Sequence, residues 1–107
     1  MKQSIKSIWI ESEEKGTVIG GQPLIDDNSD VVVTLMDERR YIATFFTYSN
    51  IERLRRKNSE TGECLSGKYF WASDMILIDQ IEREQITQVI EHLIKEEEFN
   101  QVFRRLE

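Results

Sequence analysis

The stretch "VVVTLMDERRYIATFFT", residues 31–47, carries the strongest strand signal in the chain. Its two halves, 31–36 and 41–47, are rich in β-branched and aromatic side chains, which favour strands. Because only a few polar residues separate the halves, they predict an antiparallel hairpin. Neither half alternates cleanly between polar and apolar residues, as is typical of strands covered at least in part on both faces. We therefore expect this hairpin to form the middle of a sheet.

Further strand-like runs lie on both sides of the hairpin. Residues 5–10 and the shorter run 17–19 precede it, and residues 69–79 follow it. The last run has a polar break at Ser73–Asp74 that is typical of a bulge. Residues 20–30 are dense in turn formers and predict a loop. The sequence therefore predicts additional strands on either side of the central pair.

Two segments have helical patterns. Ser49–Glu52 fits a capping box, in which the serine oxygen accepts a backbone N–H, and predicts a short surface helix over 50–57. Glycines in residues 58–67 predict that a loop follows it. Apolar residues at helical spacing predict the principal amphipathic helix over 82–97. The apolar residues after Asn100 predict a last short helix at the edge of the core.

This order of elements predicts one α+β domain that spans residues 1–107. We expect an antiparallel sheet of about four to five strands, a main C-terminal amphipathic helix and one or two short helices. The helices should lie mainly on one side. One face of the sheet would then lack a helical cover, and an exposed aromatic side chain on that face would matter for function.

Three adjacent aromatic residues, Tyr69, Phe70 and Trp71, begin the predicted strand 69–79. Successive side chains on a strand point to opposite faces, so Phe70 should face one way and Tyr69 and Trp71 the other. We expect Phe70 to lie in the core. For Tyr69 and Trp71 the alternatives are the core, which we favour, and a protein-docking surface.

Charge is distributed unevenly along the chain. Fourteen Lys and Arg residues against twenty Asp and Glu residues give a net charge of −6, with acidic ends and a basic middle. A net acidic surface repels phosphate backbones at long range and attracts basic partners. The balance therefore argues against a general nucleic-acid binder and favours a basic protein as partner. The alternative is that the negative charge only maintains solubility.

The sequence contains no recognisable catalytic or metal-binding set. Metal sites usually need three or four ligands, whereas this chain has one histidine, His92, and one cysteine, Cys64, on different predicted elements. His92 lies beside the apolar stripe of the last long helix and reads as a boundary residue, and Cys64 as a half-buried thiol. We therefore expect no enzymatic activity, no metal and no cofactor.

The cysteine content and the hydropathy of the chain indicate its cellular compartment. A single cysteine cannot form an internal disulfide, which is typical of a reducing cytoplasm. No stretch approaches the roughly 18 apolar residues that a membrane span needs, and the N-terminus lacks the apolar core of a signal peptide. We expect a cytoplasmic protein that does not associate with a membrane.

A basic cluster in the middle of the chain is the best argument for nucleic-acid binding, because it lies near Tyr69 and Trp71 and sheet aromatics stack on bases in several RNA-binding modules. Its members are Arg39, Arg40, Arg53, Arg55, Arg56, Lys57 and Lys68. A recognition motif is missing and the net charge opposes this interpretation. We favour the alternative that these side chains are solvated or paired with Glu52 and Glu60, and we leave open whether the segment 53–57 binds anything.

The segment "YIATFFTYSNIERLRRKNSETGECLSGKYFWASDMILID", residues 41–79, resembles a family of small bacterial proteins of similar length. The features that carry the resemblance are the strand end "ATFFTY", the helix start "NI", the turn "GE" and the stretch "GKYFWASDM". Small acidic proteins of this kind resemble immunity proteins of polymorphic or contact-dependent growth inhibition toxin systems. The resemblance attaches a catalytic role to none of these residues.

What the resemblance implies is a non-enzymatic cytoplasmic protein that binds and neutralises a cognate toxin domain. Toxic nuclease domains are commonly basic, so an acidic inhibitor can mimic the charge of the substrate and associate rapidly. The alternatives are a small nucleic-acid-binding protein and a homo-oligomeric interaction protein. The oligomeric state, monomer or homodimer, stays open.

Acidic loops and exposed aromatics are the candidate partner contacts. Three acidic patches qualify, and because loops carry specificity more often than regular elements do, we favour the two nearest the N-terminus over residues 96–98. The candidate set is Glu11, Glu13, Glu14, Asp26, Asp27, Asp30, Tyr69 and Trp71.

Overall fold

The computed structural model describes residues 4–14 and 27–106, and in these residues the chain forms an α+β fold. The strands are β1 (Ile5–Ile10), β2 (Asn28–Leu35), β3 (Arg40–Thr47), β4 (Met75–Ile78) and β5 (Arg104–Leu106). The helices are α1 (Glu11–Glu14), α2 (Tyr48–Thr61), α3 (Glu63–Gly67), α4 (Arg83–Lys95) and α5 (Phe99–Val102). The expected fold class is confirmed at this level. The expected strand at 17–19 lies outside the described residues.

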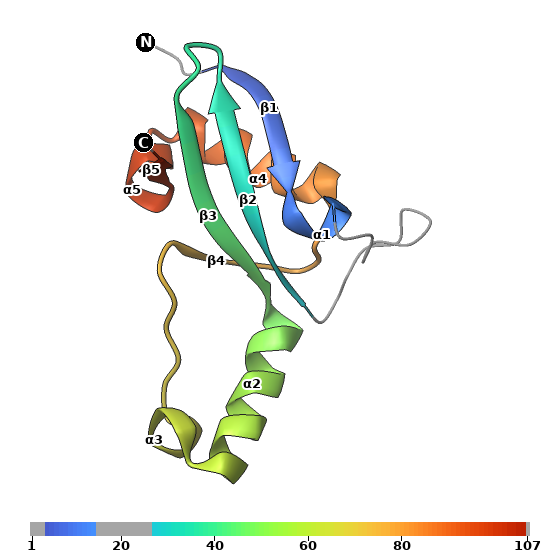
Figure 1. Ribbon diagram of the computed structural model, residues 1–107, viewed down its shortest axis with the longest axis vertical. Helices are drawn as coiled ribbons and strands as arrows, with labels where there is room; N and C mark the ends of the chain where they lie inside the picture. The colour runs from blue at the N-terminus through green and yellow to red at the C-terminus, as the bar shows by residue number, and fades with distance from the viewer. Residues whose placement is uncertain (1–3, 15–26, 107) are drawn as a thin grey trace.

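The predicted hairpin forms the centre of a five-stranded sheet, with strand order β1-β2-β3-β4 (Figure 1). β2 and β3 pair antiparallel with Val33 opposite Tyr41, and β1 adds antiparallel to the outer edge of β2. The expected antiparallel arrangement fails at one place, because β4 runs parallel to β3. A parallel pair needs a long crossover connection, and residues 48–74 with α2 and α3 supply it.

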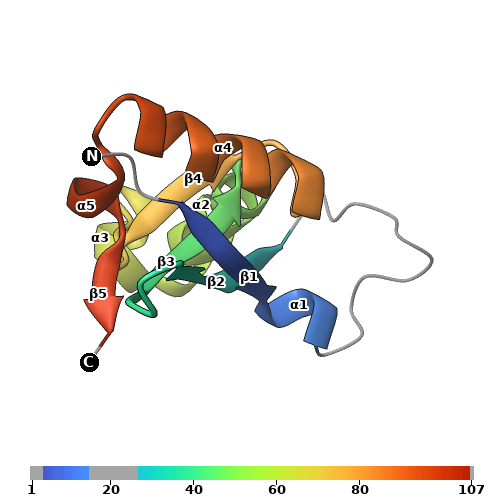
Figure 2. The same cartoon turned by 90° about the horizontal axis from the view of Figure 1, so that it is seen from above.

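The core lies between the sheet and the C-terminal helices. Alternate residues of the hairpin strands, among them Val33 and Phe45, point to this side and are completely buried. Helix α4 lies along the same face of the sheet (Figure 2) and buries Ile86 and Ile90 against it. The remaining members of the core cluster are Ile10, Val31, Leu35, Tyr41, Ala43, Ile78, Ile81, Phe99 and Phe103.

Two C-terminal expectations need correction. Helix α4 lies where the principal helix was expected, but with 13 residues it is shorter than α2, which has 14, so a single main C-terminal helix is not confirmed. The last short helix is α5, and the chain then forms β5, which the sequence analysis missed. β5 pairs antiparallel with the first residues of β3, with Ile42 opposite Arg104.

Helix α2 begins earlier and ends later than predicted. Its N-cap is Thr47, whose side-chain oxygen accepts the backbone N–H of Asn50, so the predicted capping box at Ser49 is wrong. The helix continues to Thr61, and Gly62 ends it in a left-handed conformation (φ 87°) with its N–H donating to the Asn58 carbonyl. The predicted loop 58–67 therefore starts as the last turn of α2, and the rest of it forms the short turn α3, in which three residues are left-handed.

The predicted strand at 69–79 is wrong over its first half, because only Met75–Ile78 is a strand. The physical reason is competition for the edge of β3. Pairing with β4 begins at Thr44, whose N–H donates to the Asp74 carbonyl. The earlier part of the same edge of β3, Arg40–Ile42, is occupied by β5. Asp74 also has a positive φ of 56°, which turns the chain away from the sheet.

Residues 48–71 form an arm that extends beyond the end of the sheet (Figure 1). Helix α2 descends from β3, α3 packs against it, and the chain returns along the other side to β4. The helices are closely packed at Gly67, where a Cβ atom would lie only 2.5 Å from the Arg55 carbonyl oxygen. The fully buried residues of α2 are the polar Asn50 and Asn58, whereas its apolar residues Ile51 and Leu54 are half-buried.

Candidate protein-docking surface

The acidic residue Glu13 is engaged within the fold. The Arg83 guanidinium donates to its carboxylate, with 2.8 Å between Nη2 and Oε1, and the same nitrogen donates to the Ile8 carbonyl at 2.9 Å. These contacts link α1, β1 and α4. Both side chains stay partly exposed, so Glu13 combines a structural contact with access to solvent.

Asp30 and Glu11 also take part in internal contacts. The Thr44 hydroxyl donates to Asp30 Oδ1 at 2.7 Å, and the Asp30 N–H donates to Glu11 Oε1 at 3.4 Å. Asp27 Oδ1 accepts the N–H of Asn28 at 2.7 Å. These carboxylates therefore help to fix β2, its neighbour β3 and the short helix α1.

Two members of the candidate set cannot be placed in this way. Asp26 and the side chain of Glu14 lie outside the described part of the structure. The less favoured acidic patch, residues 96–98, is exposed at the end of α4, and Glu97 there has a positive φ of 60°.

Phe70 and its two neighbours differ in burial as expected, though for a different reason, but Phe70 is half-buried and does not belong to the core cluster in which it was expected. Phe70 packs edge-on against Phe46 at a centroid distance of 5.6 Å, whereas Tyr69 and Trp71 are 52% and 69% exposed. The favoured core interpretation of Tyr69 and Trp71 is therefore wrong. Because the triplet lies on the return segment of the arm and not on a strand, only Phe70 reaches the sheet.

The arm adds further exposed apolar surface and positive charge. Leu65 in α3 is 70% exposed. It follows Cys64 and precedes Ser66, and all three residues have left-handed backbone conformations, with φ between 51° and 58°. Five basic and three acidic residues give the arm a net charge of +2, so the rest of the chain carries −8. An exposed aromatic and basic arm thus extends from an acidic body.

The predicted basic cluster is exposed on α2 and at Lys68. Arg55 donates to Glu52 with 3.1 Å between Nη2 and Oε1. This hydrogen bond, with the attraction between the charges, lowers the pKa of the Glu52 carboxyl and raises that of the guanidinium. The expected pairing of the cluster with Glu52 is therefore present at Arg55. Figure 1 shows α1 beside β1 and the return segment of the arm on the far side of α2, so Glu11 and Glu13 lie apart from the aromatic pair, whereas the Asp27 N–H donates to Thr47 at the start of the arm.

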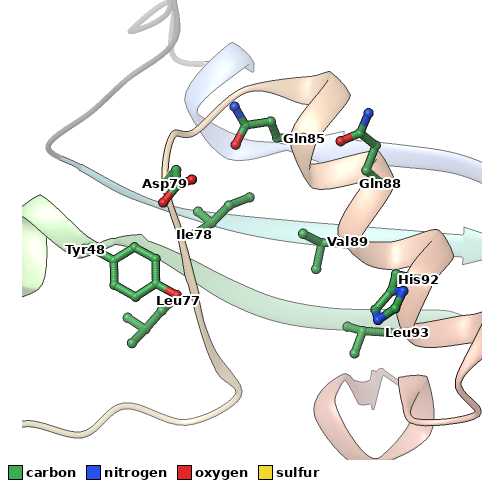
Figure 3. A pocket seen from close by; sticks show the side chains of 9 residues that line it. All are labelled: Tyr48, Leu77, Ile78, Asp79, Gln85, Gln88, Val89, His92 and Leu93. Carbon is green, nitrogen blue, oxygen red and sulfur yellow. The ribbon is translucent and has the colours of Figure 1, made fainter.

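A groove of about 520 Å³ lies between β4, α4 and the start of α2 (Figure 3). Figure 3 shows Tyr48 beside Leu77 on one side of the groove and Val89, His92 and Leu93 of α4 on the other. The complete lining is Tyr48, Leu77, Ile78, Asp79, Gln85, Gln88, Val89, His92 and Leu93. Apolar side chains of α4 thus face those of β4 and Tyr48 of α2 across a groove that also carries polar groups.

The polar groups of this groove differ in how they are held. Gln85 donates to the Gln80 side chain at 3.1 Å, which orients its amide. Asp79 and His92 are exposed. No arginine or lysine belongs to the described lining, and Asp79 is the one acidic residue in it. The groove can therefore accept an apolar ligand that also carries a positive charge.

His92 and Cys64, the residues considered for metal binding, lie on α4 and α3 at different levels of the long axis (Figure 1). Among residues 4–14 and 27–106, no group of three or more His, Cys, Asp or Glu side chains is arranged to hold a metal ion. Within the same described ranges, no helix has the length and apolar character required to cross a membrane.

Comparison with protein-family models, with curated proteins and with solved structures finds no match for this chain.

Sequence reasoning missed the groove and the extent of the arm. Tyr48, which directly follows the predicted strand 41–47, is 56% exposed, and Leu77, which lies in the predicted strand 69–79, is 39% exposed. The sequence signal for the groove was the polar break at Ser73–Asp74, which indicates that the strand begins only at Met75. A strand with this start places Leu77 beside the end of β3. The position of Val89 and His92 across from Leu77 depends on the tertiary packing of α4.

Proposed function

We propose that this protein is a non-enzymatic immunity protein that neutralises a cognate toxin domain by binding it. The observation that carries the proposal is the exposure of Tyr69 and Trp71 on either side of the anchored Phe70. Aromatic side chains held in place but left in solvent are characteristic of the residues that dominate protein interfaces. They lie in solvent on either side of this contact with β3, where a partner can reach them.

The charge distribution supports a basic partner. Outside the arm the chain carries −8, which attracts a cationic protein at long range and accelerates encounter. A nuclease toxin domain has this character because its substrate is polyanionic. The resemblance of residues 41–79 to a family of small bacterial proteins, which are similar to immunity proteins, points in the same direction and implies an encounter in the cytoplasm.

The acidic body and the aromatic arm should contribute to binding in different ways. The acidic body provides electrostatic attraction, and the arm provides aromatic contact area that is lost from water on binding. Each large aromatic side chain contributes more to affinity than a charge at the rim of an interface does. We therefore assign most of the binding free energy to the arm and most of the association rate to the body.

A second candidate function is binding of single-stranded nucleic acid by the arm. It is favoured by the exposed cations of α2 on the same arm as Tyr69 and Trp71. Stacking and phosphate contacts of this kind give affinities that fall steeply with salt. A salt titration with single-stranded RNA, using the Arg55→Ala/Arg56→Ala double variant as comparison, separates this candidate from protein binding.

The test of the proposed function uses the protein encoded by the gene immediately upstream. Co-expression should protect bacterial cells from that protein, and the two chains should co-purify as a stable complex. The Tyr69→Ala/Trp71→Ala variant should lose both properties. Trp9→Ala is the matched control, because Trp9 is also exposed (42%) but lies on β1. Equal loss in both variants would show that aromatic exposure on the arm has no special role.

A further inference from the structure

We propose that the groove beside β4 binds an extended, basic segment of the partner, which adds to the free edge of β4 as a further strand. The inference deepens the proposed function and rests on it, since the segment belongs to the protein that is neutralised. It concerns a different surface from the aromatic arm.

The backbone N–H and C=O groups of β4 alternate in direction along the strand. Thr44 is opposite Met75, and the Thr44 N–H donates to the Asp74 carbonyl. In a parallel ladder this register directs the N–H and C=O groups of Ile76 and Ile78 to β3, and those of Met75 and Leu77 away from it. β4 is the last strand of the sheet order among the described residues, so Met75 and Leu77 present hydrogen-bonding groups that a further strand can use.

The groove lies along this outer edge of β4. Leu77 and Ile78 are neighbours on a strand and point to opposite faces, yet both line the groove. A cavity lined by both residues must run along the edge of β4. Opposite that edge, Val89 and Leu93 of α4 provide apolar contacts for alternate side chains of an added strand (Figure 3).

The charge of the groove favours a basic segment as its ligand. Asp79 is exposed at the end of the groove, and no arginine or lysine belongs to its described lining. A lysine or arginine on the added segment can pair with this carboxylate. A second copy of β4 is a poor occupant, because "MILI" contributes no cation and brings a second Asp79. Like charges placed close together oppose such pairing.

The test removes the outward hydrogen-bond donor without disturbing the ladder to β3. Leu77→Pro deletes an N–H that faces away from β3, and proline is tolerated on edge strands in that orientation. Leu77→Val keeps the N–H and a branched apolar side chain and is the matched control. Asp79→Lys, at an exposed position, is a second variant that tests charge without risk to folding.

Two probes are used with each variant: the upstream gene product and a peptide of alternating valine and lysine, with a valine and glutamate peptide as control. Binding should slow amide hydrogen exchange at Met75 and Leu77. The Leu77→Pro and Asp79→Lys variants should bind the partner more than about ten-fold more weakly, a change of about 1.4 kcal/mol, and Leu77→Val should bind normally. The glutamate peptide should not bind.

Several outcomes separate this inference from the proposed function. If the partner is bound and neutralised equally well by Leu77→Pro but not by the arm variant, the groove inference is overturned and the proposed function stands. If the lysine peptide protects Met75 and Leu77 while no toxin is neutralised, the proposed function fails and the groove remains a peptide site. Protection of these amides that depends only on protein concentration would assign the edge to a second copy and overturn the inference.

Discussion

Phe70 lies edge-on against Phe46, with ring centroids 5.6 Å apart and ring planes at 70°. This contact fixes the return segment of the arm on the sheet, because Phe46 belongs to the central strand β3 and is itself buried. The neighbouring residues Tyr69 and Trp71 cannot reach the sheet from this position and remain exposed. A single anchored ring thus determines how the arm presents two others.

Substitutions in the aromatic triplet should differ in their effect on the stability of the fold. Phe70→Ala removes a half-buried ring and should lower the free energy of unfolding by about 1–3 kcal/mol, less than for a fully buried phenylalanine. Trp71→Ala removes an exposed side chain and should change it by no more than about 0.5 kcal/mol. Urea unfolding of both variants measures the difference. Equal destabilisation by the two substitutions would contradict the anchoring role of Phe70.

The cap of α2 provides a second prediction. Thr47 is fully buried, and its hydroxyl oxygen accepts the N–H of Asn50 at 3.0 Å and of Asp27 at 3.1 Å. Thr47→Ala leaves two donors without this acceptor and should cost about 1–3 kcal/mol of unfolding free energy. Thr47→Ser, which keeps the oxygen, should cost less.

Ser49→Ala serves as the control for this helix start, because Ser49 is exposed and belongs to the capping box that the sequence wrongly predicted. Its effect should stay within about 0.5 kcal/mol. Thermal or urea unfolding distinguishes the two positions, and a larger loss at Ser49 than at Thr47 would refute the assigned cap.

The packing of α3 on α2 depends on Gly67. Its φ is 80°, and an added Cβ would lie 2.5 Å from the Arg55 carbonyl oxygen and 3.1 Å from the Ser59 nitrogen. Gly62 has a similar φ of 87° but open space around the added atom. Gly62→Ala should cost about 1–2 kcal/mol for the backbone conformation alone. Gly67→Ala should cost more and should accelerate amide exchange in α3, which hydrogen-exchange mass spectrometry detects.

The pair of Glu52 and Arg55 makes a prediction about pH. The hydrogen bond from Arg55 lowers the pKa of Glu52 below its ordinary value of 4.5. Arg55→Ala should therefore raise the pKa of Glu52, and Lys57→Ala should not. A carboxyl with a lowered pKa in the folded state stabilises the fold above its unfolded pKa, and this contribution disappears as the pH falls through the folded pKa. NMR titration of the Glu52 carboxyl measures the change.

The hairpin and the C-terminal helical region were accessible to sequence reasoning because their signals are local. Residues 31–47 combine strand propensity with a short polar turn, and the structure pairs Val33 with Tyr41 accordingly. The stripe that includes Ile86 and Ile90 predicts one buried helix face, and both residues are completely buried. Such patterns depend only on the spacing of residues along the chain, so they can be recognised without knowledge of tertiary contacts.

The arm and β4 were not accessible in this way, because competition between distant segments decides them. The run that includes Tyr69 has the composition of a strand, yet the edge of β3 that it would need is shared by Met75–Ile78 and by Arg104–Leu106. The positions of Tyr69 and Trp71 therefore depend on strand β5, which is far from them in the sequence. The groove depends in the same way on how α4 lies beside Leu77.

The most direct test of the central claim is co-expression of this chain with the protein encoded immediately upstream, with cell growth and co-purification measured together. The account predicts that cells survive, that the two chains elute as one complex, and that Tyr69→Ala/Trp71→Ala abolishes both effects while Trp9→Ala preserves them. Survival without a complex, or death of cells that contain both folded chains, would contradict the claim that this protein acts by binding and neutralising that partner.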